Sequence, residues 1–141
     1  MHISLTRLKL HSPLLLGGFV KGANASIAQI QRARGFQGGA LLVDSWFTFW
    51  TISGWESEAA MRAFRDAGAH GAIMPKLLDW CCEASVASWE AEALPDWPQA
   101  HAQMLALGRS SKVKRPNRNH LAGKIAPIRP WFPERPIPAK A

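Results

Sequence analysis

The chain has 141 residues, of which 48% are apolar, so it is long enough to form one domain with a buried core. Its formal net charge is +7, but residues 109–141 hold nine Lys or Arg and one Glu, so residues 1–108 are nearly neutral. No nucleic-acid recognition motif accompanies the basic segment and no apolar run approaches the length of a membrane span, so we expect neither a nucleic-acid partner nor a transmembrane segment.

Apolar spacing predicts the elements of the first 108 residues. Alternating apolar and polar residues indicate strands, and spacings of three and four residues indicate helices. The predicted elements are a strand over 2–10, a helix from Pro13 to its cap Gly35, strands over 36–43 and 46–55, a helix from the N-cap Ser57 to about Met74, a strand over 83–92 and a short helix over 97–107 capped by Gly108. This β-α-β-β-α-β order predicts an α+β, ferredoxin-like fold.

The third strand has aromatic residues on both faces. Trp46 and Trp50 fall on one face, and Phe47, Phe49 and Trp55 fall on the other. We therefore expect both faces of the sheet to be covered, one by helices and the other by a ligand or a second subunit.

Pro75 places the end of the second long helix. A residue before proline is disfavoured in helical conformation, so the helix is expected to end at Met74, and residues 75–81 are compatible with a short second piece.

The composition changes after Gly108, so we divide the chain into a domain over 1–108 and a basic, Pro-rich tail or arm over 109–141. Six of the ten prolines lie between 116 and 138, and residues 129–138 are typical of an extended polyproline segment. Two interpretations stay open: an arm that anchors Trp131 and Phe132 on a partner subunit, or a disordered tail.

The two cysteines, Cys81 and Cys82, are adjacent in the chain. A disulfide between neighbours is strained, and the spacing fits no zinc motif. We expect two reduced thiols and a cytoplasmic protein.

His70 is the strongest candidate for chemistry. Neutral imidazole can ligate a metal or move a proton near neutral pH. The small residues at 67–69 and 71–72 would leave room for a flat, bulky group, such as a haem or a polyaromatic substrate. The local sequence alone favours the simpler interpretation, an exposed histidine near a helix C-terminus.

A family resemblance adds to this reading of the residues. Gly35-Phe36, "GGALL" at 38–42, "FWTISGWESEAAMRAF" at 49–64 and the Ala-His pair that ends at His70 resemble the dimeric α+β barrel superfamily, and the resemblance covers about residues 2–92. That superfamily includes antibiotic-biosynthesis and haem-degrading monooxygenases, and within it the chain is most similar to spheroidene monooxygenase-like proteins.

The resemblance implies a ferredoxin-like protomer, a homodimer that forms a barrel, and a pocket between each sheet and its own helices. It also implies haem b with His70 as the axial ligand. Haem-degrading members have a Trp where this chain has Phe64, and an Asn on the first strand where it has Leu-Thr-Arg-Leu at 5–8. We therefore do not expect haem degradation.

The sequence thus predicts a haem-binding, monooxygenase-like oxidoreductase that acts on an apolar small molecule. His70 is the predicted metal ligand and catalytic residue. The other predicted cofactor contacts are Trp50, Trp55, Phe64 and Met74. Two alternatives are a cofactor-independent monooxygenase with His70 as general base and a dimer that binds a small molecule without turnover.

Overall fold

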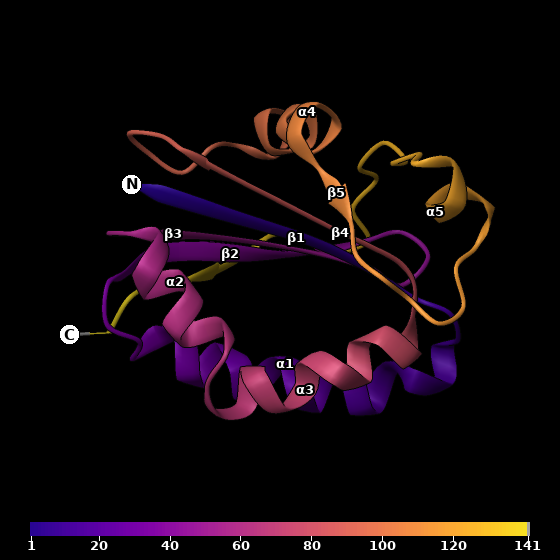
Figure 1. Cartoon of the computed structure of the whole chain (residues 1–141), viewed down its shortest axis with the longest axis horizontal. Coiled ribbons are helices and arrows are strands. Elements are labelled where there is room, and N and C mark those ends of the chain that lie inside the picture. The colour runs from indigo at the N-terminus through magenta and orange to yellow at the C-terminus, as the bar shows by residue number, and fades with distance from the viewer. Residues whose placement is uncertain (141) are drawn as a thin grey trace.

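The computed structural model describes residues 1–140, which form one antiparallel sheet with a helical layer on each face (Figure 1). The strands are β1 (His2–Leu10), β2 (Phe36–Asp44), β3 (Thr48–Trp55), β4 (Cys81–Glu90), β5 (Arg109–Ser110) and β6 (Arg135–Ile137). The helices are η1 (Pro13–Leu15), α1 (Leu16–Gln31), α2 (Glu58–Arg65), α3 (Gly68–Trp80), α4 (Trp97–Leu107) and α5 (Arg118–Ala122).

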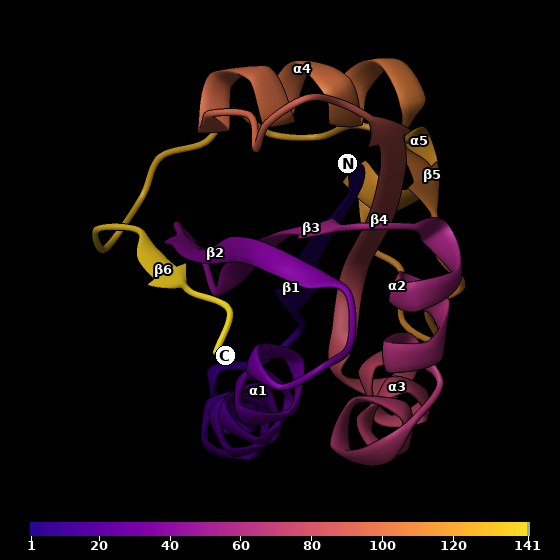
Figure 2. The same ribbon diagram turned by 90° about the vertical axis from the view of Figure 1, so that its left-hand side faces the viewer.

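The sheet order is β5-β4-β1-β3-β2-β6, with every neighbouring pair antiparallel. β1 through β4 give the predicted α+β, ferredoxin-like arrangement. Helices α1, α2 and α3 cover one face, which we call the helix-side face, and α4 covers the other, the far face (Figure 2). Among the described residues no helix has the length and apolarity that a membrane crossing needs.

Local signals in the sequence begin and end several helices. The Ser57 side chain accepts a hydrogen bond from the Ala60 backbone at the start of α2, and Gly108 caps α4, as predicted. Asp96 and Gln99 form a capping box at the start of α4.

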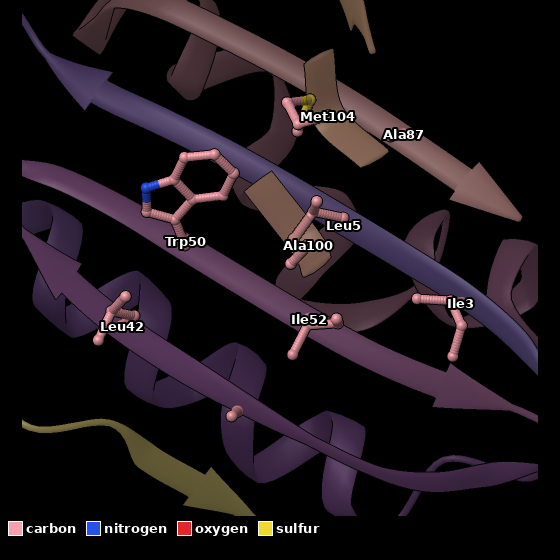
Figure 3. Close-up of a cluster of buried hydrophobic side chains, with 9 residues drawn as sticks. Ile3, Leu5, Leu42, Trp50, Ile52, Ala87, Ala100 and Met104 are labelled. Atoms are coloured by element: carbon pink, nitrogen blue, oxygen red, sulfur yellow. The ribbon is translucent and has the colours of Figure 1, made fainter. Parts of the chain in front are cut away.

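Alternation along the strands sorts the core onto two faces. Ile3 and Leu5 of β1 are fully buried on the far face, together with Trp50 and Ile52 of β3, and they pack against Met104 of α4 (Figure 3). Both faces of β3 are covered, as predicted. The far face, however, is covered by α4 and the C-terminal segment of the same chain, so the prediction that a ligand or a second subunit covers it is wrong.

The second long helix differs from the prediction. It does not end at Met74: the chain breaks at Asp66 and Ala67, and α3 then runs through Pro75 to Trp80. The break is set by Gly68, whose φ of +57° is a left-handed conformation that glycine adopts without strain. Proline in a helix interior removes one backbone hydrogen bond, and α3 tolerates that loss.

The tail is part of the sheet. β5 pairs with β4, and β6 pairs with β2 at the opposite edge. The Lys140 backbone N–H donates to the Gln31 carbonyl at 3.0 Å, so the arm is held along α1 of its own chain. Ile137 is 2% exposed and packs with Trp55 and Met61. The arm is therefore anchored on the sheet from which it comes.

A row of polar contacts crosses the far face and fixes the C-terminal segment at two points. Arg7 Nη1 donates to Glu83 Oε1 at 2.7 Å, and both side chains are almost fully buried. The Arg7 guanidinium lies 5.7 Å from the Trp50 ring centroid, and Trp50 Nε1 donates to Asp44 Oδ2 at 3.0 Å. These contacts join β4, β1, β3 and β2 in turn.

The C-terminal segment binds both ends of this row. Asn117 Nδ2 donates to Glu83 Oε2 at 2.6 Å, and the Arg129 backbone N–H donates to Asp44 Oδ1 at 2.7 Å. Burial raises the pKa of Glu83, but the hydrogen bonds from Asn117 and Arg7 outweigh it and hold that pKa below its ordinary value of 4.5.

We expect Glu83→Gln to lower the free energy of unfolding by about 3–5 kcal/mol, because it leaves the buried Arg7 charge without a counter-charge. The Glu83 carboxylate stabilises the fold above pH 4.5, where it is ionised in both states, and this contribution is lost as the pH falls through its lowered pKa. Urea unfolding at several pH values measures both effects. The exposed Glu92→Gln is the matched control, and an equal loss in the two variants would contradict the prediction.

Candidate functional site

A cavity of about 300 Å³ lies between the helix-side face of the sheet and helices α1, α2 and α3. This volume falls at the lower end of the range for pockets that hold drug-sized molecules. Apolar residues supply most of its wall: Phe19, Ala23, Ile27 and Ile30 from α1, Met61 and Phe64 from α2, Ile73, Met74, Leu77 and Leu78 from α3, and Leu8, Leu41, Trp55, Ala84, Val86 and Ile137 from the strands.

Four of the five predicted site residues line this one cavity. His70 and Met74 lie one turn apart on α3, and Phe64 and Trp55 continue the wall from α2 and β3. The ring centroids of Phe64 and His70 are 4.7 Å apart, and those of Trp55 and Phe64 are 5.4 Å apart. The aromatic rings therefore form a continuous wall that leads to the imidazole.

Trp50, the fifth predicted residue, does not belong to this site, and that prediction is wrong. Trp50 and Trp55 are separated by an odd number of positions on one strand, so they point to opposite faces. The indole of Trp50 lies on the far face, 6.0 Å from the His101 ring, and is fully buried there.

His70 lies in the first turn of α3, not near the end of a long helix as predicted. Gln29 of α1 fixes this turn with three hydrogen bonds. Its Oε1 accepts from the His70 backbone N–H at 2.8 Å, and its Nε2 donates to the carbonyls of Ala67 at 2.8 Å and Phe64 at 3.3 Å. One side chain from α1 thus sets where α3 begins and where His70 stands.

The small residues around His70 serve the turn itself. A Cβ on Gly68 would lie 3.1 Å from the Gln29 carboxamide, and a Cβ on Gly71 would lie 2.8 Å from the Asp66 carbonyl oxygen. These glycines let the chain turn closely against its own backbone and against Gln29. Clearance for a flat ligand is therefore not needed to explain them.

The His70 imidazole has a defined tautomer. Nδ1 lies 3.0 Å from the Arg65 carbonyl oxygen, which can only accept, so Nδ1 carries the proton and Nε2 keeps a free lone pair. Burial lowers the pKa of His70, against a smaller opposing effect of the Arg65 hydrogen bond. The positive end of the α3 dipole also disfavours imidazolium at this position. At neutral pH His70 therefore offers the cavity an uncharged imidazole.

The floor of the cavity carries small hydroxyl side chains. Ser4 of β1 pairs in register with Ser53 of β3 and Ser88 of β4, and Thr6 pairs with Thr51 in the next row. All five line the cavity. The wall is thus apolar, whereas the floor can hydrogen-bond an oxygen or nitrogen of a bound molecule.

A serine on α1 adds a further polar group opposite this floor. The Oγ of Ser26 is buried, and within the described part of the chain it has no hydrogen-bond partner. A buried hydroxyl without a hydrogen-bond partner is energetically costly, so a hydrogen bond from Ser26 to a polar atom of a ligand would be favourable.

Charged residues stand at the rim of the cavity. Arg62 pairs with Glu58 at 2.6 Å, Arg65 pairs with Asp66 at 3.0 Å, and Arg109 of β5 lines the cavity from the other side. The two carboxylates offset the charges of Arg62 and Arg65, so the net positive charge of these rim residues comes from Arg109.

Sequence reasoning missed the hydroxyl floor and Gln29. The floor has a local signal, because Ser4 and Thr6 alternate with the buried Ile3 and Leu5 on a strand whose two faces are both covered. Gln29 has no local signal in the sequence, because its role depends on a turn that is 35 to 41 residues away along the chain.

Solved structures with this fold come from several bacteria. A putative antibiotic biosynthesis monooxygenase from Nitrosomonas europaea superposes with a TM-score of 0.59 at 11% identity, covering 66% of this chain and 100% of that one. A mutant of SnoaB, a cofactor-independent oxygenase from Streptomyces nogalater, gives 0.55 at 17% identity, covering 67% and 97%. Rv0793 from Mycobacterium tuberculosis gives 0.58 at 9% identity, covering 68% and 100%.

These likenesses establish the fold: the chain has the α+β fold of antibiotic biosynthesis monooxygenases. No protein-family model and no curated protein matches the sequence.

We expect Gly68→Ala to lower the free energy of unfolding by about 1–2 kcal/mol, because alanine resists the left-handed conformation and its methyl group would press on Gln29. Gly17→Ala is the matched control: no atom lies within 4 Å of the added methyl group, and alanine favours the helix. Denaturant unfolding compares the two variants. A Gly68→Ala protein as stable as Gly17→Ala would contradict the assigned role of the turn.

We expect His70 to titrate below its ordinary pKa of 6.5, because burial disfavours the imidazolium. Imidazole NMR signals followed against pH measure this pKa, and His70→Gln identifies the signal. As the pH falls through 6.5 the unfolded chain takes up a proton that the folded chain resists, so the wild type should lose more stability than His70→Gln over this range. Titration of His70 at or above 6.5 would contradict the buried, neutral state.

Proposed function

We propose that this protein is a monooxygenase-like oxidoreductase that binds an apolar small molecule in the sheet–helix cavity and acts through Nε2 of His70. One observation carries the proposal. The Arg65 carbonyl holds the proton on Nδ1, so the free lone pair of a neutral imidazole is offered at the wall of an apolar cavity. The fold shared with antibiotic biosynthesis monooxygenases supports the same class of reaction.

The chemistry of the substrate follows from the cavity. Its apolar wall would bury the body of the molecule, while the hydroxyl row of Ser4, Ser53 and Ser88 would bind a polar atom at its edge. We therefore propose an apolar molecule with at least one hydrogen-bonding oxygen. Ser26 would contact a second polar atom from the helix side.

Haem b is the cofactor that we propose for His70. Metal-ligating histidines commonly donate their second ring nitrogen to a carbonyl or carboxylate, as Nδ1 of His70 does. The described residues contain no cluster of three or more His, Cys, Asp or Glu side chains suited to a metal ion, so a metal here would take its other ligands from a cofactor. A single imidazole donor fits haem, because the iron of a haem can be held by one axial histidine of the protein.

His70 would ligate the iron, and Trp55, Phe64 and Met74 would contact the macrocycle. When bound, haem would supply a centre for one-electron and O₂ chemistry. Phe64 takes the position at which haem-degrading members of the superfamily that the chain resembles have Trp. We therefore propose that haem is a cofactor of the reaction and not its substrate. The closer likeness to spheroidene monooxygenase-like proteins stays a prediction.

A second candidate function is a cofactor-independent monooxygenase in which His70 is the general base. The lowered pKa of His70 supplies a neutral base at pH 7, as general-base catalysis requires. Nε2 would accept a proton from an acidic C–H or O–H of the substrate, and the electron pair would stay on the substrate for attack on O₂. The imidazolium would keep its Nδ1–H bond to Arg65.

We keep the homodimer and the cytoplasmic location as part of the proposal. The far face of the sheet is already covered by α4 and the C-terminal segment, so a second subunit would meet these elements first. The rim of the cavity and the helix-side layer would then stay accessible to the substrate.

The deciding experiment is titration of the purified protein with hemin. We expect the Soret band to shift on binding to the wild type, and this shift to be lost in His70→Ala, which removes the axial ligand. His11→Ala is the matched control, because it removes an exposed histidine outside the cavity and should leave the shift intact. Identical spectra for the wild type and His70→Ala would refute the ligand assignment.

Oxygen consumption with electron-rich phenols as probe substrates separates the remaining alternatives. Uptake without hemin that is lost in His70→Ala supports the general base. Binding of a phenol without uptake, both without hemin and with hemin plus ascorbate as the electron donor, would show a binding protein without turnover and would overturn the enzymatic proposal.

A further inference from the structure

The turn between β2 and β3 lies at the end of the molecule away from both termini (Figure 1). Exposed aromatic side chains gather at this turn. The turn between β2 and β3 presents Trp46, which is 70% exposed, and the C-terminal segment places Trp131 and Phe132 beside it, 44% and 61% exposed. The ring of Trp131 lies 6.1 Å from Trp46 and 5.3 Å from Phe47. We call these four residues the aromatic patch.

The backbone of the turn is strained in a way that keeps Trp46 in solvent. Trp46 and Phe47 both have left-handed φ values, 58° and 57°, which bulky residues rarely adopt. The Phe47 carbonyl accepts from the Leu10 backbone N–H at 3.1 Å, and the Phe47 ring packs into the core below. Strain of this kind persists where the surrounding structure enforces it and often marks a functional site.

The basic C-terminal segment is anchored to this same end. The Lys114 backbone N–H donates to the Leu78 carbonyl at the end of α3, and the Asn117 backbone N–H donates to the Cys82 carbonyl at the start of β4. The Ser45 backbone N–H donates to the Arg129 carbonyl at the turn itself. The anchored segment carries the exposed cations Lys112, Arg115, Arg118 and Arg129, and Arg129 lies beside the turn.

Most acidic groups at this end are engaged, and the exposed Glu134, two residues after Phe132, offsets one of the four cations. Asp79 forms an ion pair with Lys114 at 2.9 Å. Glu83 and Asp44 are buried in the polar row of the far face. The surface at this end therefore combines exposed indole and phenyl rings with a net positive charge.

We infer that this end of the protein docks on an anionic lipid bilayer. Tryptophan is enriched where protein meets the membrane–water interface, because its indole is apolar with one polar edge. Lys and Arg beside it are attracted to anionic headgroups, at about 1 kcal/mol for each cation near the surface. A single-stranded nucleic acid could also use the cations and stack its bases on these rings, but no nucleic-acid recognition motif accompanies the basic segment, so a bilayer is the occupant that we propose. This inference does not depend on the proposed function.

Co-sedimentation of the full chain with vesicles tests the inference. We expect binding to vesicles of phosphatidylcholine and phosphatidylglycerol in equal parts, little binding to phosphatidylcholine alone, and weaker binding as salt is raised. Replacing Lys112 and Arg115 together by Gln should weaken binding about 25-fold, at about fivefold for each cation. The matched control replaces Arg32 and Arg34, two exposed cations between α1 and β2, by Gln and should leave binding unchanged.

The role of the aromatic patch has its own pair of variants. Trp46→Asn keeps a residue that tolerates the left-handed turn and should weaken binding at least about tenfold. Leu105→Asn, which removes an exposed apolar residue from α4, should have no effect. Circular dichroism of each variant confirms that it is folded.

Three results would overturn the inference. One is equal binding of the wild type to neutral and anionic vesicles, or to neither. Another is a pair of test variants that bind as well as their controls. The third is a Trp46→Asn protein that changes from dimer to monomer while the wild type ignores vesicles, since the patch would then be an interface between copies of this chain.

Discussion

The buried pair of Arg7 and Glu83 is the contact on which the far side of the molecule depends. A charge can be kept in a sheet interior only if it is paired and hydrogen-bonded, and here the pairing extends across four strands through Trp50 to Asp44. The carboxylates at the two ends of this row also bind the C-terminal segment. One set of polar contacts therefore fixes the sheet and determines where the basic, aromatic-bearing segment lies.

The two faces of the sheet consequently have different tasks. On the far face, the buried charges of Arg7 and Glu83 pair within the chain, and α4 closes the core. On the helix-side face, the strands carry small hydroxyl residues, and the helices stand far enough away to leave a cavity. His70 enters that cavity from a turn fixed by Gln29, so the chemistry of the site depends on contacts between α1 and α3 more than on the sheet.

The order of strands and helices could be predicted from the sequence because its signals are local: alternation along β1 and β3, and the caps Ser57 and Gly108. The same signals placed His70, Phe64, Trp55 and Met74 in the elements that line one cavity. Trp50 was assigned to the wrong face even though the strand's alternation already separated it from Trp55. The break before α3 was missed because Pro75 gives the stronger local signal, and the hydrogen bonds from Gln29 that fix the turn at Gly68 are long-range.

The position of β6 has a consequence for the order of folding. The hairpin of β2 and β3 closes over a short turn, whereas β6 pairs with β2 across about a hundred residues of chain, and such distant contacts are the slowest to form. Until β6 arrives, β2 is an open sheet edge, and the cavity lacks the wall that Ile137 supplies. The last strand to dock therefore both protects the nascent sheet from pairing with other chains and completes the binding site.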